Sequence, residues 1–93
     1  METKYLETAL AVARARSFTR VARARSAAQS TISRHIAVLE AEVHAKLFTR
    51  PPGPVEPTAA GRAFLPHAEA VVASVKSAVE KAQAVSGGQR RGG

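Results

Sequence analysis

Polar side chains that can hydrogen-bond to the edges of bases share one face of a predicted helix beginning near residue 29. The apolar residues of this segment recur at spacings of four, three and four, which marks a buried helix face made of Ile32, Ile36, Leu39 and Val43. The face left outside, near the N-terminal end, carries Gln29, Ser30, Ser33 and Arg34. A glutamine amide can form two hydrogen bonds with adenine, and a guanidinium can pair with guanine or hold a phosphate. The segment therefore predicts base reading, and the alternative is a face that is merely solvated.

The charge balance points to a polyanionic partner. The chain has 93 residues, with 14 Lys and Arg, 7 acidic residues and a formal net charge of +7. Seven of the basic residues and two of the acidic ones lie within residues 1–36. Nucleic acid is therefore the first partner to consider, ahead of an anionic membrane surface.

A second set of residues is expected to hold the DNA backbone without reading its sequence. Thr19 is predicted to cap a short helix, and the free N–H groups beside Thr19 and Arg20 would suit a phosphate. Thr31 and His35 on the predicted reading helix, and Arg50 beyond it, complete the expected backbone contacts. For Arg50, pairing with a surface carboxylate is an equally weighted alternative.

Metal binding and catalysis have no support in the sequence. The chain contains no Cys, and His35, His44 and His67 stand 9 and 23 residues apart with no Asp nearby. There is no Gly-rich phosphate-binding motif, and the chain is too short to enclose a substrate pocket. We expect no enzyme activity, no metal and no cofactor.

These residues must be positioned by a few helices and a Pro-rich loop. The apolar spacing of Leu6, Ala9, Leu10 and Ala13 predicts a buried face on a helix over Thr3 to Ala15. Helices are also predicted over Thr19 to about Arg25 and about 29–43, and these two form a helix-turn-helix. Four prolines and a glycine within residues 51–57 forbid helix and allow only two very short strands around a turn, the outline of a wing. We predict a mainly α, winged helix-turn-helix domain over residues 1–57.

The rest of the chain is predicted to be a long dimerisation helix. Thr58 can cap a helix that runs to about Ser86, and residues 87–93 have the composition of a flexible basic tail or hinge. A heptad seam follows this helix for three repeats, through Phe64, Ala68, Val71, Val75, Ala78, Ala82 and Val85. A second stripe with Leu65, Val72 and Val79 lies beside it. One small monomer cannot cover both stripes, which favours a homodimer over a plain core helix.

Length and hydropathy place the chain in a broad class. Its length suits one small domain. The longest uncharged stretches are far shorter than the roughly 20 apolar residues of a membrane span, and the charged N-terminus does not look like a signal peptide. We expect a soluble, cytoplasmic protein.

Several short strings occur in a characteristic order: SFT at 17–19, QSTISRHI at 29–36, LE at 39–40, LFTR at 47–50, TAAG at 58–61 and LPHA at 65–68. Together they resemble the N-terminal DNA-binding domain of LysR-type transcriptional regulators, over nearly the whole chain. The resemblance implies a bacterial regulator that binds a pseudo-palindromic site on double-stranded DNA as a homodimer, with the 29–43 helix in the major groove. It also implies that any small-molecule effector binds a larger C-terminal domain, which family members usually carry beyond this region.

The sequence departs from the family pattern at Ala9, Arg25, Ala28, Ser30, His44 and Gly53. Arg25 stands where a buried Leu is usual, and it could pack its stem while sending the guanidinium to water. Ala28 stands where a Ser or Thr cap is usual, and Ser26 with Gln29 could supply a capping box instead. His44 replaces a glycine that ends the helix, which predicts a strained turn.

The predicted function is thus sequence-specific transcriptional regulation through DNA binding. The alternative is a basic dimer that coats DNA without choosing a sequence or that binds another protein, and competition between an operator and bulk DNA would separate the two. A helix resting on a membrane surface is disfavoured, because Lys76 and Lys81 are the only cations along most of the polar face of the long helix.

Overall fold

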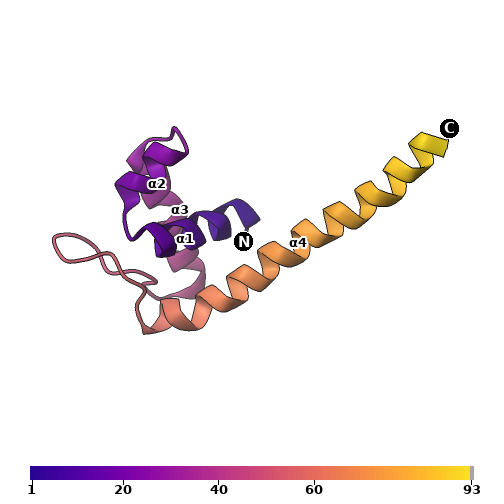
Figure 1. Ribbon diagram of the computed structural model, residues 1–93. Coiled ribbons are helices and arrows are strands. Elements are labelled where there is room, and N and C mark those ends of the chain that lie inside the picture. The colour runs from indigo at the N-terminus through magenta and orange to yellow at the C-terminus, as the bar shows by residue number, and fades with distance from the viewer. Residues whose placement is uncertain (93) are drawn as a thin grey trace.

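A three-helix body carries a projecting loop and a long helix that extends away from it (Figure 1). The computed structural model describes residues 1–92, with side chains through Gly87. Its helices are α1 (Thr3–Ala15), α2 (Phe18–Ala24), α3 (Gln29–Val43) and α4 (Ala59–Gly92). The extension of α4 gives the molecule dimensions of 58 × 28 × 19 Å.

The apolar stripe of α3 forms the centre of the core, as the sequence predicts. Ile32, Ile36 and Leu39 are at most 1% exposed, and they pack with Phe48 from the loop that follows. Val43, at the end of the stripe, is half-buried against the same cluster. The opposite face of α3 is thereby fixed toward solvent.

The buried face of α1 is broader than its predicted stripe. Leu6 and Ala9 are buried as expected, but so are Val12 and Thr8, both 0% exposed. This happens because α1 lies between α3 and α4 and packs against both. The predicted core residue Leu10 is only half-buried and lies on the side facing α4.

The N-cap of helix α2 stands two residues before the predicted one. Ser17, and not Thr19, is the N-cap residue, since its Oγ accepts the backbone N–H of Arg20 at 3.0 Å. Ser17 has the extended backbone that a capping residue requires, whereas Thr19 already lies in the first helical turn. The prediction for Thr19 as a cap was wrong.

The ends of α3 are capped only by the backbone. The predicted capping box of Ser26 and Gln29 is not formed: Ser26 has φ 52° and stands outside the helix, and the N-cap residue Ala28 offers no side-chain bond. At the other end, His44 has φ 56°, a left-handed conformation that costs a residue with a side chain about 1–2 kcal/mol. This agrees with the strain predicted from His44 standing in place of glycine.

The wing is a loop closed by a single bridge. Phe48 and Pro57 form an isolated antiparallel pair, supported by a bond from Thr49 N to Glu56 O of 2.8 Å. Residues 1–92 contain no strand, so the prediction of two short wing strands was wrong. The prolines of the loop lack the N–H groups that would extend the ladder.

Thr58 caps α4, as predicted. Its Oγ1 accepts the backbone N–H of Gly61 at 3.0 Å and donates to the carbonyl of Lys46. The helix continues to Gly92, beyond the predicted end at Ser86, because no proline stops it and extending a helix is much cheaper than starting one. None of the helices described is long and apolar enough to cross a membrane.

Candidate nucleic-acid interface

The predicted base-reading residues lie together on the outer surface of the N-terminal half of α3. Gln29, Ser30 and Arg34 are exposed, and Ser33 is half-buried. Because Ala28 provides no side-chain cap, the first N–H groups of α3 are left to water or to an anionic ligand. The structure therefore brings the predicted set to a single surface with unpaired donors at its edge.

One reading residue is held by the neighbouring helix. Thr19 Oγ1 donates to Gln29 Oε1 at 3.0 Å, across the turn between α2 and α3. Thr19 is predicted to contact a phosphate, and in the free domain its hydroxyl proton is engaged by this amide instead. The bond connects the first turn of α2 with the first residue of α3.

Two of the predicted backbone contacts lie at helix N-termini. Arg20 is exposed in the first turn of α2, and Thr31 is half-buried in the first turn of α3. In the part of the chain that the structure describes, no carboxylate lies within ion-pair distance of Arg20 or Arg34. Their contact with phosphate stays a prediction.

His35 is half-buried between α1 and α3 and bonded to a buried hydroxyl. Its Nδ1 lies 2.9 Å from Thr8 Oγ1, and its ring lies 4.8 Å from the ring of Tyr5. Thr8 donates to the carbonyl of Lys4 at 3.0 Å and accepts from Arg25 Nη1 at 3.0 Å. Because its proton goes to that carbonyl, Thr8 is an acceptor for both His35 and Arg25.

The guanidinium of Arg25 thus does more than point into water. Besides its bond to Thr8, Arg25 Nη2 donates to the carbonyl of Glu7 at 3.3 Å. The side chain that replaces an apolar residue of the family pattern ties the end of α2 to α1.

The surroundings of His35 disfavour its charged form. Burial lowers its pKa below the usual 6.5, and the positive charges of Lys4, Arg34 and Arg25 lower it further, against a small opposing effect of Glu2. His35 is therefore held neutral in the free domain at pH 7.

Arg50 is occupied within the protein. Its Nη2 lies 2.8 Å from Glu40 Oε1, its Nη1 donates to the carbonyl of Phe48 at 2.9 Å, and the guanidinium stands 5.1 Å from the ring centre of Phe18. The partner carboxylate is only 6% exposed and also accepts the backbone N–H of Leu47 at 2.7 Å. Of the two predictions for Arg50, the free domain shows the carboxylate pair, with the carboxylate buried and not on the surface.

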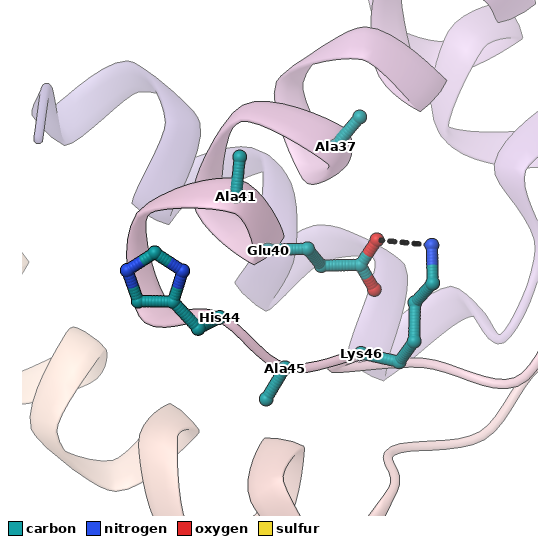
Figure 2. Close-up of a pocket in the computed structure, with 6 residues that line it drawn as sticks. All are labelled: Ala37, Glu40, Ala41, His44, Ala45 and Lys46. Carbon is teal, nitrogen blue, oxygen red and sulfur yellow. Dashed lines mark ion pairs between the residues drawn. The ribbon is translucent and has the colours of Figure 1, made fainter.

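The C-terminal half of α3 presents a shallow hollow in place of long side chains. Figure 2 shows its lining, in which Ala37 and Ala41 leave the helix surface bare and Lys46 reaches toward Glu40, 3.8 Å from Nζ to Oε1. The polar reading residues are thus confined to the N-terminal half. Within residues 1–92, no group of three His or acidic side chains could hold a metal ion.

The predicted dimer seam divides into a covered and an exposed part. Ala68 is 2% exposed and Phe64 is partly buried, since both pack against the domain's own core. Beyond them the valines of α4 are open to solvent at 45–64% exposure: Val71, Val75, Val79 and Val85. Val79 comes from the second predicted stripe, so the exposed apolar face draws on both.

Sequence reasoning missed Glu40 and Thr8. Glu40 directly follows the buried Leu39, and a cation ten residues away could have indicated a partner for a buried carboxylate. Thr8 precedes the buried Ala9 and is four residues from Val12, which places it at the edge of the inner face.

The fold and the exposed face of α3 define a winged helix-turn-helix domain with a long C-terminal helix. Residues 3–62 match the family model described as bacterial regulatory helix-turn-helix protein, lysR family. The chain therefore belongs to the LysR family.

Known regulators are similar to this chain in sequence. The regulator ShiR of Corynebacterium glutamicum (strain R) is 46% identical over 87 residues, and BudR of Klebsiella aerogenes is 43% identical over 88. These matches cover 94% and 95% of this chain, which spans 30% of ShiR and 62% of BudR.

Solved structures match as well. The DNA complex of DarR from Vibrio fischeri has a TM-score of 0.86 at 31% identity, over 92% of this chain and 30% of DarR. The DNA-binding domain of BenM, solved with catB site 1 DNA, has a TM-score of 0.85 at 31% identity, over 92% of this chain and 97% of that domain.

Proposed function

We propose that this chain is the DNA-binding part of a LysR-type transcriptional regulator, acting in the bacterial cytoplasm without catalysing a reaction. The observation that carries the proposal is the exposure of Gln29, Ser30 and Arg34 on one face of α3. The chain is similar to nearly the whole DNA-binding domain of BenM, which was solved on DNA. This similarity supports placing the exposed face of α3 against a duplex. Helix α3 would enter the major groove with its N-terminal half foremost.

The proposed contacts are of two kinds, to base edges and to the DNA backbone. Gln29, Ser30, Ser33 and Arg34 would contact base edges, and Arg20 and Thr31 would contact phosphates through the helix N-termini. Thr19 and His35 each have a partner within the domain, so phosphate contact would add to or replace those bonds. For Arg50, the bond to Glu40 supports a structural role over a phosphate contact.

Two copies would bind together through α4. Val71, Val75, Val79 and Val85 leave an apolar face uncovered in the monomer, and a second copy of the helix is a self-complementary partner. A two-fold dimer presents two copies of α3 and therefore favours a pseudo-palindromic operator. In this division, residues 1–57 bind DNA and 58–86 pair the subunits. Residues 87–93, of which the last lies outside the described residues, would be a hinge, and any effector would bind a larger domain of the kind that family members usually carry.

Selection from a randomised duplex pool tests the proposal. We expect the recovered sites to share a pseudo-palindrome and to bind more tightly than random DNA of equal length. Recovery of sites without a common sequence, bound no better than random DNA, would instead favour a protein that coats DNA non-specifically.

A further inference from the structure

The reading face contains one side chain that is oriented by another helix. Thr19 Oγ1 donates to Oε1 of Gln29, the first residue of α3, at 3.0 Å. Both residues are exposed, and each belongs to a helix anchored in the core, through Val21 for α2 and Ile32 for α3. The bond therefore joins two core-anchored helices at the point where α3 would meet DNA.

This bond decides which end of the amide is free. A glutamine side chain carries one acceptor, Oε1, and two donors on Nε2, and rotation of the amide exchanges their places. The Thr19 hydroxyl is a donor to Oε1, so it turns Oε1 toward α2 and leaves the Nε2 donors as the free end. Gln29 is thereby presented as a donor.

We propose that Thr19 is a positioning residue that sets the base preference of Gln29. This inference rests on the proposed function, since it requires α3 in the major groove. A donor suits bases that display acceptors there: guanine through N7 and O6, adenine through N7 and thymine through O4. Cytosine displays an amino donor and would be disfavoured, because the bond to Thr19 turns the amide oxygen that could accept from it toward α2 and away from the groove.

A phosphate contact by Thr19 makes a different prediction. Contacts to the DNA backbone hold the protein in register and carry no sequence information directly. Losing such a contact lowers affinity for every sequence alike. Losing a positioning bond instead changes the relative affinity for the four bases at one position.

The test uses Thr19→Val, which removes the hydroxyl and keeps the shape of the side chain, and Thr19→Ser, which restores it. Arg20→Ala is the matched control for a pure loss of backbone contact. Sites selected with the parent are varied through all four bases at the position where Gln29→Ala abolishes preference. Affinities are then measured by competition, and circular dichroism checks that each variant is folded.

We expect Thr19→Val to reduce the discrimination against cytosine by about three- to tenfold, and Thr19→Ser to retain the parent preference. In a Gln29→Ala background, Thr19→Val should leave the preference unchanged, since the coupled partner is gone. An equal loss on all four bases, as for Arg20→Ala, or no change at all would overturn the inference and leave the proposed function standing. A parent that shows no base preference anywhere would overturn both.

Discussion

The carboxylate of Glu40 joins the reading helix to the wing through Arg50, with 2.8 Å between Oε1 and Nη2. The Glu40 side chain is 5% exposed and that of Arg50 is 35% exposed, so the pair lies at the edge of the core. The second carboxylate oxygen of Glu40, Oε2, accepts the backbone N–H of Leu47. One buried acid thus fixes both the end of α3 and the start of the loop.

Glu40→Ala should lower the free energy of unfolding by about 3 kcal/mol, since it leaves the Leu47 N–H unsatisfied and the Arg50 cation without its partner. Urea unfolding measures the change. Glu42→Ala is the control: Glu42 is exposed and pairs with the N-terminus at 3.3 Å, so it should cost no more than about 0.5 kcal/mol. Equal effects of the two substitutions would show that the buried pair does not stabilise the domain.

Stability should fall as the pH drops below the usual pKa of His35. The folded pKa is below 6.5, so the unfolded chain binds a proton first and is favoured as the pH falls through this value. The loss levels off once the pH is below the folded pKa. Urea midpoints between pH 8 and pH 5 should decline less for His35→Gln than for the parent. A parent slope in His35→Gln would rule out this origin.

Gly61 allows the start of α4 to lie close to the backbone of Leu47. A Cβ at this position would overlap the carbonyl oxygen of Leu47, which is backbone and cannot turn aside. Gly61→Ala should cost about 1–3 kcal/mol in thermal or urea unfolding. Gly53→Ala adds a Cβ at an ordinary 3.9 Å from the nearest atom, the carbonyl oxygen of Arg50, so it should be close to neutral. A neutral Gly61→Ala would mean that the contact relaxes without cost.

Val75→Glu tests the pairing of subunits. Val75 is 45% exposed in the middle of the apolar face of α4, and a dimer would bury two unpaired carboxylates there. Sedimentation should show a largely monomeric variant, and circular dichroism should show unchanged helicity. Ala73→Glu places the same charge elsewhere on the exposed helix and should remain dimeric. If Val75→Glu and Ala73→Glu dimerise equally strongly, the apolar face of α4 is not the interface.

Sequence periodicity predicted correctly which face of α3 is exposed, because one buried stripe suffices to orient the helix. It misplaced part of the buried face of α1, since it assumed packing on one side, whereas Leu10 faces α4 and Thr8 faces His35. Glu40 escaped prediction for a related reason. A carboxylate is buried only when distant groups satisfy it, and its bonds to Leu47 and Arg50 depend on how the loop folds back.

The wing shows the same limit. Proline content correctly predicted a non-helical turn after Phe48, but whether two strands form depends on how many N–H groups find partners across the loop. Thr49 N and Thr58 N bond to the backbone oxygens of Glu56 and Leu47, whereas Glu56 N bonds to the side chain of Thr49 and adds nothing to the ladder. A single bridge is the result.

In the proposed function, Gln29 and Arg34 of α3 read bases while Arg20 of α2 holds a phosphate, and binding across salt concentrations measures this most directly. The parent dimer, neutralising about three or four phosphates per subunit, should give a log–log slope of roughly −5 to −7. Gln29→Ala and Arg34→Ala should each lose about 1–3 kcal/mol on the selected site and much less on random DNA. Arg20→Ala should weaken both DNAs equally and reduce the magnitude of the slope by about one unit. Equal losses on both DNAs for Gln29→Ala and Arg34→Ala would contradict the account, because α3 would then hold DNA without reading it.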